Sequence, residues 1–462
     1  MNKIKSTLKK LTNAKVHFIG IGGIGMCGLA ELLHNMGAHV TGSDMQENAQ
    51  VQRLTEMGIQ VFIGHQGDQI GDSEVIVYSS AVKPHNEEYR EARRRGVPLI
   101  PRAEALAEMM RLKRGVAVAG THGKTTTTSM AASVFLTAKV DPTIIVGGRL
   151  DVIKSTAQLG QGEWLLAEAD ESDGSFNRLS PEIVIVTNID NDHLDHYKDF
   201  ENLKNAFYDF ASRVPFYGSV ILCGDDSKVR EVFADFPKRT LYYGFDGNND
   251  FVLKGEKGKY EVHTEDGLLG EFVIPVPGRH NALNALAAIV AGLAAGLDFE
   301  TCAEGISRFR GVDRRFQKRG EAAGVLFYDD YGHHPTEVSA VLSAFKEGFP
   351  DRRLVVLFQP HRYSRTQLCW EQFLDCFKDA DHLFVMDIYP AGEAVIQGVN
   401  ARLLVQQMHH PNVDYLGDGG DKNIEGLGQF LRQGDVLVTL GAGNVWKTGD
   451  AVRTYLDEGV QK

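Results

Sequence analysis

The chain has 462 residues, 43% of them hydrophobic and 24% charged, and a net charge of −12 from 49 basic and 61 acidic residues. A chain of this length exceeds one hydrophobic core, so two to four domains are expected. The acidic balance argues against a nucleic-acid partner, because phosphate contacts need a basic face. The sequence holds no apolar run long enough for a transmembrane helix, and its basic start lacks the apolar stretch of a secretory signal. We therefore expect a cytoplasmic protein without membrane insertion.

Five cysteines are scattered along the chain, at Cys27, Cys223, Cys302, Cys369 and Cys376. Their number is odd and none forms a CxxC pair, which argues against both a zinc site and a disulfide framework. We expect buried thiols without a chemical role.

Short apolar strands alternate with helical patterns over the first hundred residues. The expected strands lie at 16–23, 38–44, 60–65 and 74–80. Such alternation predicts parallel strands joined by crossover helices. A helical segment at 102–115 ends in a basic cluster and a glycine, and it links this region to the next.

Two further strand-helix series follow. The second has expected strands at 115–119, 163–171, 182–190 and 218–226, then a glycine-rich antiparallel stretch at 240–275 and a helix at 280–296. The third has expected strands at 324–331, 352–360, 381–390, 412–417 and 435–443. The sequence therefore predicts an α/β protein of three domains, each a mainly parallel sheet with flanking helices, at 1–108, 109–313 and 314–462.

Residues 120–125, Gly-Thr-His-Gly-Lys-Thr, lie between an apolar strand and a helix start. Lys124 can bring positive charge to the β- and γ-phosphates of a nucleotide, and the Thr125 hydroxyl can bind Mg²⁺. The usual GxxxxGK[ST] pattern fails at its first position, which is Val118. The strand-loop-helix context still favours an ATP-type phosphate loop over a chance match.

Acidic residues follow two of the expected strands in this second series. One group contains Glu168, Asp170, Glu171 and Asp173, and the other contains Asp190, Asp192, His193 and Asp195. Carboxylates at the carboxyl ends of parallel strands face the crevice in which α/β proteins bind ligands. Either group alone is compatible with a solvated loop. Together with a phosphate loop they favour Mg²⁺ coordination.

The first loop matches GxGxxG at Gly20, Gly22 and Gly25, and Asp44 stands where a ribose-binding acid is usual. The pattern indicates a diphosphate at a helix N-terminus with a carboxylate near a ribose. NAD and a nucleoside diphosphate sugar both fit that description, and glycines kept only for packing are the third alternative.

Eight segments in collinear order resemble the Mur ligase family. They read GIGGIGM, AGTHGKTTTT, ADESDGSF, TNIDNDHLDHY, GRHNALNALAA, GVDRRFQ, YDDYGHHPTEV and FQPHRYSRT, and begin at residues 20, 119, 169, 187, 278, 311, 328 and 358. The resemblance implies a Rossmann-like N-terminal domain, a P-loop ATPase-like central domain and a Rossmann-like C-terminal domain. It implies ATP-dependent joining of the UDP-N-acetylmuramate carboxylate to the amine of L-alanine, through an acyl phosphate, in peptidoglycan precursor synthesis. The alternative is the related recycling reaction, which attaches an intact tripeptide to the same nucleotide sugar. The GxGGxGM form of the first loop favours the alanine-adding reaction.

The resemblance assigns the two glycine loops to different ligands. The first holds UDP-N-acetylmuramate, with implied contacts from Gly22, Gly23, Gly25, Met26, Asp44, His65, Ser79 and Ser80. The second holds ATP, with implied contacts from Gly120, Thr121, His122, Gly123, Lys124, Thr125, Thr126, His280, Asn281, Asn284 and Arg315. Two Mg²⁺ ions are expected, with Thr125, Glu171 and His193 as ligands and Glu168 as a second-rank candidate.

The third domain is expected to supply the amino-acid side of the reaction. The implied amino-acid-binding residues are His334, His361, Arg362 and Arg365, with Tyr331 and His333 in the same cleft. An arginine fork suits a carboxylate, and Asp330 or His334 can accept the amine proton. A plain polar turn before a helix is the alternative for this segment. The expected catalytic set is Lys124, Glu171, His193, Arg315, Asp330 and His334, in a monomer or weak homodimer.

Two other classes explain less of the chain. An NAD-dependent oxidoreductase leaves the second loop and both acidic groups without a role, and a GTPase-like switch leaves the first and third domains without one. One departure from the family is also visible. Several Mur ligases carry a carbamylated lysine where this chain has Tyr208, and Lys204 lies one helical turn earlier. We therefore expect no carbamate to support the second Mg²⁺.

Overall fold

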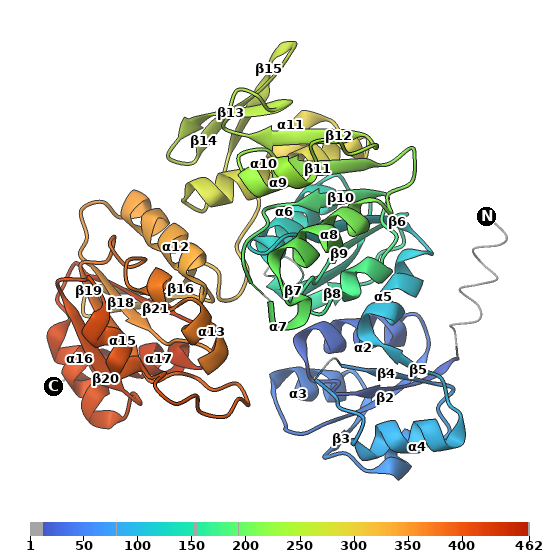
Figure 1. Cartoon of the computed structure of the whole chain (residues 1–462), viewed down its shortest axis with the longest axis horizontal. Coiled ribbons are helices and arrows are strands. Elements are labelled where there is room, and N and C mark those ends of the chain that lie inside the picture. The colour runs from blue at the N-terminus through green and yellow to red at the C-terminus, as the bar shows by residue number, and fades with distance from the viewer. Residues whose placement is uncertain (1–12, 80, 151–152, 154, 193, 461–462) are drawn as a thin grey trace. The chain divides into compact units, whose positions relative to one another are not determined.

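The computed structural model describes residues 13–460 except 80, 151–152, 154 and 193, and only the backbone of 24, 148–150, 194–195 and 460. The chain divides into two compact units. Unit 1 comprises Met1–Gly255, Lys259–Ile274 and Leu283–Arg310, and unit 2 comprises Glu256–Gly258, Pro275–Ala282 and Gly311–Lys462. Three sheets form their frameworks, two in unit 1 and one in unit 2 (Figure 1).

The first sheet of unit 1 is parallel throughout, in the order β3-β2-β1-β4-β5. Its strands are β1 (Lys15–Ile19), β2 (His39–Asp44), β3 (Gln60–Ile63), β4 (Val75–Tyr78) and β5 (Leu99–Pro101). The helices between them are α2 (Ile24–Asn35), α3 (Ala49–Glu56), η1 (Gly67–Ile70) and α4 (Glu87–Arg95). Strands β2 and β3 lie on one side of β1, and β4 and β5 lie on the other side. At such a switch point the loop after β1 opens into a crevice beside β4, where α/β proteins bind ligands.

Helix α5 (Arg102–Met110) joins the first sheet to the second. It is shorter than the expected segment 102–115, because Arg114 already begins strand β6 (Arg114–Ala119). The inner face of α5 is buried, and Met109 and Met110 belong to the hydrophobic core of unit 1.

The second sheet has ten strands in the order β15-β14-β13-β12-β11-β10-β6-β9-β7-β8. Beyond β6, these are β7 (Thr143–Leu150), β8 (Ser155–Gln158), β9 (Trp164–Glu168), β10 (Ile183–Val186), β11 (Ser219–Cys223), β12 (Thr240–Gly244), β13 (Phe251–Glu256), β14 (Lys259–Thr264) and β15 (Gly267–Val273). Its central strands β10, β6 and β9 are parallel neighbours with continuous apolar runs, as expected for strands buried on both faces. The loops after these three strands therefore meet at one edge of the sheet.

The helices of this region are α6 (Lys124–Thr137), η2 (Ser175–Arg178), α7 (Leu194–Tyr197), α8 (Phe200–Ala211), α9 (Ser227–Val232), α10 (Arg279–Ala294) and α11 (Phe299–Ser307). Helices α6 and α11 pack together, and α11 also contacts β15 (Figure 1). The antiparallel expectation for 240–275 is correct for the pair β14 and β15. It is wrong for β12, which pairs parallel with both β11 and β13. The connection through α9 is a crossover, so β12 returns in the direction of β11.

Unit 2 contains a six-stranded sheet in the order β16-β17-β21-β18-β19-β20. The strands are β16 (Gln317–Ala322), β17 (Val325–Asp330), β18 (Leu354–Phe358), β19 (His382–Met386), β20 (Val413–Gly417) and β21 (Val436–Leu440). Its helices are α12 (Pro335–Gly348), α13 (Tyr363–Leu368), α14 (Trp370–Phe373), α15 (Ala401–Gln407), α16 (Asp421–Phe430) and α17 (Val445–Val460). Among the described strand pairs of this sheet, β16 with β17 is antiparallel and the others are parallel.

These sheets confirm the predicted α/β fold with three mainly parallel sheets and flanking helices. The domain limits at 108 and 313 stay a prediction. All five cysteines are buried thiols, as expected. No described helix is long and apolar enough to cross a membrane.

Candidate functional site

The first glycine loop is held against the end of β2. Ser43 accepts hydrogen bonds at its carbonyl oxygen from Gly20 N (2.8 Å) and Ile21 N (2.9 Å), and Gly22 N donates to Asp44 Oδ2 at 2.8 Å. A Cβ atom on Gly22 would lie 2.8 Å from Asn48 Nδ2 and 2.9 Å from Asp44 Oδ2. The loop therefore approaches β2 too closely for any side chain at this position.

The same loop opens helix α2, whose N-cap residue Gly23 makes no side-chain capping hydrogen bond. The end of the helix can thus offer backbone N–H groups to an anion. Ser79, directly after β4, packs against Gly20, and His65 contacts the neighbouring Ser43 at 2.9 Å. The side chain of Met26 is buried in the core, and its Cγ would lie 3.6 Å from a Cβ atom on Gly23. Ser80 lies outside the described residues.

Arg102, which the sequence did not single out, lies beside this helix end. A Cβ atom on Gly25 would approach its Nη1 to 2.9 Å, and its Nη2 lies 3.7 Å from Asp170 Oδ2. Arg102 is the first residue of α5, whereas Asp170 follows β9 in the second sheet. The guanidinium therefore stands between the first glycine loop and the acidic group that follows β9.

The second glycine loop follows β6 and is tied to the segment after β10. His122 N donates to Asn188 Oδ1 at 2.8 Å, while Asn188 Nδ2 donates to His122 O at 2.9 Å. Asp190 N donates to Thr121 Oγ1 at 2.8 Å. Gly120 has φ +133°, and a Cβ there would lie 2.0 Å from Thr187 Oγ1, so this position requires glycine. Helix α6 starts directly afterwards at Lys124.

Lys124 and Glu171 form the ion pair of this loop. Lys124 Nζ donates to Glu171 Oε1 at 2.8 Å and to Gly120 O at 2.7 Å. The Glu171 side chain is only 1% exposed. Burial raises the pKa of Glu171 to about 7, against the opposing effect of the Lys124 charge. Burial acts to lower the pKa of Lys124, but the carboxylates of Glu171, Asp170 and Glu168 outweigh it and the net shift is upward.

The other acidic residues have separate partners. Glu168 accepts from Gly147 N at 2.9 Å, Asp173 accepts from Ser175 N at 3.0 Å, and Asp190 lies 3.2 Å from both His122 Nε2 and Lys228 Nζ. Glu171 and Asp190 both contact the second glycine loop, Glu171 at Lys124 and Asp190 at His122. With the hydroxyl of Thr125, which follows Lys124, Glu171 offers oxygen donors of the kind Mg²⁺ prefers. His193 and the Asp195 side chain lie outside the described residues.

The residues that were predicted to contact the adenosine of ATP belong partly to unit 1 and partly to unit 2. Asn284 belongs to unit 1, where Thr127 Oγ1 donates to its Oδ1 at 3.0 Å and a Cβ on Gly123 would lie 2.8 Å away. His280 and Asn281 belong to unit 2. Burial, with the Arg315 charge, lowers the pKa of His280 to about 4, so the ring is neutral near pH 7.

Asp330, at the end of β17, is bound on both oxygens. Phe316 N donates to its Oδ2 at 2.7 Å and Gly332 N donates to its Oδ1 at 2.8 Å. Burial raises the pKa of Asp330 to about 6. The carboxylate thereby shapes the turn that carries Arg315, whose Nη1 lies 3.7 Å from Glu337 Oε1.

His334 caps helix α12. Its Nδ1 accepts a hydrogen bond from Thr336 N at 3.4 Å. The Glu337 carboxylate accepts hydrogen bonds from the backbone N–H groups of residues 333 and 334. This capping box holds the ring in place and gives it a structural task besides any chemical one.

His361, another predicted residue of unit 2, belongs to a pair of stacked rings. The ring of His361 stacks on the ring of Tyr389, with their centroids 5.5 Å apart. The Nδ1 atom of His361 lies 3.4 Å from Arg365 Nη1. Burial and the charge of Arg365 lower the pKa of His361 to about 4. Arg362 Nε lies 3.1 Å from Glu393 Oε1. The structure thus brings His361 and Arg365 together, while Arg362 faces an acidic partner.

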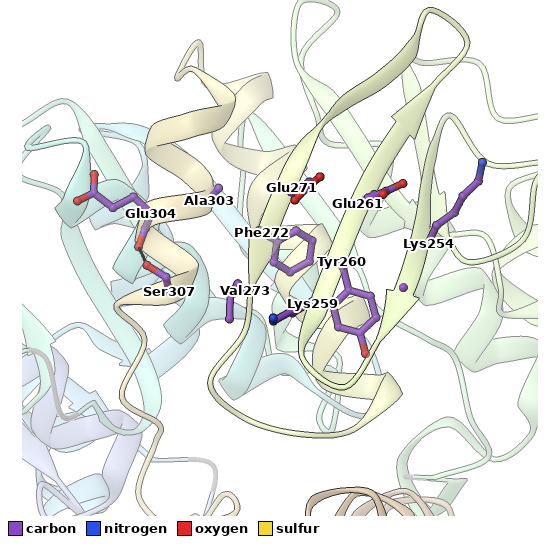
Figure 2. A pocket seen from close by; sticks show the side chains of 11 residues that line it. Lys254, Lys259, Tyr260, Glu261, Glu271, Phe272, Val273, Ala303, Glu304 and Ser307 are labelled. Carbon is purple, nitrogen blue, oxygen red and sulfur yellow. Dashed lines mark hydrogen bonds between the residues drawn. The ribbon is translucent and has the colours of Figure 1, made fainter.

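A cavity of about 680 Å³ lies elsewhere in unit 1, between the β14–β15 hairpin and α11 (Figure 2). Its walls include the stacked rings of Tyr260 and Phe272 and the carboxylates of Glu261, Glu271 and Glu304. None of the residues predicted for catalysis or binding lines this cavity.

Comparison with known proteins shows similarity along nearly the whole chain. Three family descriptions match in succession: "Mur ligase family, catalytic domain" over residues 15–114, "Mur ligase middle domain" over 118–292, and "Mur ligase, glutamate ligase domain" over 314–443. A UDP-N-acetylmuramate–L-alanine ligase of Bdellovibrio bacteriovorus is 61% identical over 97% of this chain and 100% of its own length. The corresponding ligase of a Geobacter species is 50% identical over 95% of this chain and 96% of its own length.

The crystal structure of a UDP-N-acetylmuramate–alanine ligase from Thermotoga maritima superposes with a TM-score of 0.81 at 27% identity, covering 97% of this chain and 100% of that one. The chain belongs to the Mur ligase family.

Proposed function

We propose that this protein joins the carboxylate of UDP-N-acetylmuramate to the amine of L-alanine, with conversion of ATP to ADP and phosphate, as a step of peptidoglycan precursor synthesis. The observation that carries the proposal is the pair of glycine loops in unit 1, each following a parallel strand and opening a helix. One site for a nucleotide sugar and another for ATP explain both loops, whereas one dinucleotide explains only the first. The similarity to the two alanine ligases over nearly the whole chain supports the substrate assignment.

The chemistry needs activation, because a carboxylate and an ammonium ion do not condense at neutral pH. A carboxylate oxygen of the sugar attacks the γ-phosphorus of ATP, and the bond to ADP breaks. The amine of alanine then attacks the carbonyl carbon of the acyl phosphate. Inorganic phosphate leaves with the bonding electrons, and the amine gives up its proton.

The residues of the second loop suit the first step. We assign Gly120 to Thr126 to the phosphates of ATP, with Lys124 screening the approach of the carboxylate to the γ-phosphate. Thr125, Glu171 and His193 would hold Mg²⁺, and Glu168 stays a second-rank ligand. When bound, the ion supplies positive charge at the phosphates. Lys124 is held by Glu171 in this structure, so ligand binding must exchange that partner for phosphate oxygen.

The residues of the first loop suit the nucleotide sugar. We assign Gly22, Gly23, Gly25 and the α2 N-terminus to the diphosphate, with Asp44, His65, Ser79 and Ser80 near the nucleoside. Arg102 joins this set as a cation beside the helix end.

We assign the predicted residues of unit 2 to adenosine and the amino acid. His280, Asn281 and Asn284 are assigned to the nucleoside of ATP, and Arg315 to its γ-phosphate. Arg365 and Arg362 are the candidates for the alanine carboxylate, beside His361. The backbone hydrogen bonds of Asp330 weigh against it as the acceptor of the amine proton, and the capping role of His334 constrains that ring. The proposal places a monomer or weak homodimer in the cytoplasm.

The test is phosphate release by the purified protein with ATP, Mg²⁺ and UDP-N-acetylmuramate, adding L-alanine, L-serine, glycine or the tripeptide in turn. Release that requires the nucleotide sugar and L-alanine together supports the proposal. Release with the tripeptide but not with L-alanine would assign the recycling reaction, and release with nucleotide alone would indicate a switch.

Binding offers an independent check of the first loop. UDP-N-acetylmuramate or UDP should raise the thermal unfolding midpoint, whereas NADH and NADPH should leave it unchanged. Stabilisation by NADH without an effect of UDP would contradict the assignment.

A further inference from the structure

A buried carboxylate lies beneath the first glycine loop. Glu88, the second residue of α4, is 0% exposed, although charged side chains are seldom fully buried. His17 of β1 is also 0% exposed, and its Nε2 lies 2.9 Å from Glu88 Oε1. His65, which follows β3, places its Nδ1 2.8 Å from Glu88 Oε2. One carboxylate therefore joins a histidine of β1 to a histidine in the loop after β3.

The hydrogen-bond partners determine where the protons sit. An ionised carboxylate only accepts, so His17 must donate through Nε2–H and His65 through Nδ1–H. Ser43 donates its hydroxyl to Glu88 Oε2 at 2.5 Å, and its oxygen lies 2.9 Å from His65 Nδ1. Thr41 Oγ1, 2.8 Å from His17 Nδ1, completes the cluster by donating to that ring nitrogen. In this arrangement both carboxylate oxygens of Glu88, both ring nitrogens of His17 and Nδ1 of His65 have hydrogen-bond partners.

The cluster is coupled to the glycine loop through β2. The carbonyl oxygen of Ser43 accepts from Gly20 N and Ile21 N, as described above, while its hydroxyl belongs to the cluster. Asp44, the next residue, holds Gly22 N through its carboxylate and accepts from Gly64 N at its carbonyl oxygen, at 2.8 Å in both cases. His65 comes directly after Gly64. The first glycine loop and the segment that carries His65 are thus both hydrogen-bonded to Ser43 and Asp44.

We propose that Glu88 is a positioning residue of the nucleotide-sugar site. It holds His65 as the tautomer protonated on Nδ1, so that Nε2 carries a lone pair and accepts a hydrogen bond from a hydroxyl of the sugar nucleotide. The inference rests on the proposed function, because it needs a hydroxyl-bearing nucleotide at the first loop. A purely structural role would require no buried charge, since apolar side chains fill such a position at lower cost.

Glu88→Gln is the decisive variant, because it keeps the shape and reverses one donor. The amide can still accept from His17 Nε2–H, but its NH₂ group then faces His65 Nδ1. In that orientation the nitrogen becomes the acceptor, so the proton of His65 moves to Nε2 and the lone pair offered to the nucleotide is lost. We expect KM for UDP-N-acetylmuramate to rise on the order of tenfold, as for the loss of one hydrogen bond, with KM for ATP and kcat within about threefold.

Three further variants complete the comparison. His65→Ala should raise the same KM to a similar extent, and Glu88→Gln should add nothing to it in the double variant. Glu91→Gln is the matched control, because Glu91 lies on the same helix and pairs with Arg94 and Arg95 rather than with the cluster. It should leave all three kinetic constants unchanged.

A measurement on the unmodified protein covers the case in which Glu88→Gln does not fold. Nitrogen-15 NMR of histidine-labelled protein, with the His65 signals assigned from the His65→Gln spectrum, should show the Nδ1–H tautomer. The Nε2–H tautomer at His65 would overturn the inference, as would an unchanged KM in folded Glu88→Gln. If the unmodified protein neither binds nor turns over UDP-N-acetylmuramate, the proposed function itself fails, which is a distinguishable result.

Discussion

Lys124 Nζ lies 2.8 Å from Glu171 Oε1, so the ammonium group of the phosphate loop is already paired with a buried carboxylate. If Lys124 screens the γ-phosphate during transfer, Lys124→Ala should lower turnover by a factor on the order of 10²–10³, as loss of a preorganised charge-stabilising donor does elsewhere. Steady-state phosphate release and circular dichroism test this together. Lys422→Ala, at an exposed position, is the control. A folded Lys124→Ala with near-normal turnover would show that this loop is not the ATP site.

The raised pKa of Glu171 makes the ligand-free protein sensitive to pH. With a folded-state value of about 7 against 4.5 for an exposed glutamate, the native state binds the extra proton in this interval. The contribution of Glu171 to the free energy of unfolding should therefore fall as pH rises from about 4.5 to about 7, by about 3 kcal/mol at most. Glu171→Gln removes this dependence.

The measurement compares unfolding midpoints of the two proteins between pH 5 and pH 8. The midpoint of the unmodified protein should decline relative to Glu171→Gln across this range. Parallel curves would show that Glu171 titrates at its ordinary pKa.

Arg102 should contribute to binding of the nucleotide sugar. Its guanidinium packs under the first turn of α2, where the diphosphate is proposed to bind. We expect Arg102→Ala to raise KM for UDP-N-acetylmuramate on the order of 10- to 100-fold and to change KM for ATP little, since a charged hydrogen bond contributes about 1.5–3 kcal/mol. Arg111→Ala, an exposed arginine just past the other end of α5, serves as the control. Equal increases in both KM values would argue for a general structural role.

Asp330 should prove to be structural rather than the acceptor of the amine proton. Asparagine can accept only one of its two backbone hydrogen bonds and turns an amide group towards the other N–H. Asp330→Asn should therefore lower stability by about 1–3 kcal/mol. Denaturant unfolding provides the measurement, with the exposed Asp351→Asn as the control. Unchanged stability with a loss of turnover beyond about 10³-fold would instead favour a chemical role.

Lys204 should not be carbamylated. Glu201 Oε1 and Glu231 Oε1 lie 2.6 and 2.8 Å from its Nζ, and their hydrogen bonds raise the pKa of the ammonium. Carbamylation needs the neutral amine, which these partners disfavour. Tyr208, at the position expected for a carbamylated residue, packs against Phe233 and Phe236.

Carbon-13 NMR with labelled bicarbonate tests this expectation, and Mg²⁺ titration with and without UDP-N-acetylmuramate complements it. A second Mg²⁺ should bind only in the presence of the nucleotide sugar. A carbamate resonance that disappears in Lys204→Ala would refute the expectation.

The buried parallel strands were predictable because their apolar runs are continuous, as in β10 and β18. Strand β16 was not predicted, since Gln317–Ala322 is rich in charge and lies at an edge, where pairing and not burial defines the strand. The early end of α5 escaped prediction because the helical periodicity of 102–115 runs on into a residue that pairs in β6.

The candidate site divides in a similar way. The place of Lys124 at the start of a helix was predictable from residues adjacent in the sequence, and the place of Glu171 because it follows a buried strand. The roles assigned to both residues stay predictions. Arg102 and Glu88 were missed, since their contacts join segments far apart in the chain and no local spacing marks them. The structural role of Asp330 was hidden for the same reason: its partners are backbone N–H groups, which carry no sequence signature.

The attachment of the second glycine loop to residues 187–190 bears on the thermodynamics of nucleotide binding. The backbone of His122 already makes hydrogen bonds with the side chains of Asn188 and Thr187, so the conformation of the loop is established when the protein folds. Ordering a flexible segment costs roughly 1–2 kcal/mol per residue in backbone conformational entropy. Because the loop is ordered during folding, this entropy cost is part of the folding free energy and not of the free energy of triphosphate binding. Affinity at this loop should then depend on exchanging solvent and the Lys124 partner for phosphate oxygens, with little contribution from loop ordering.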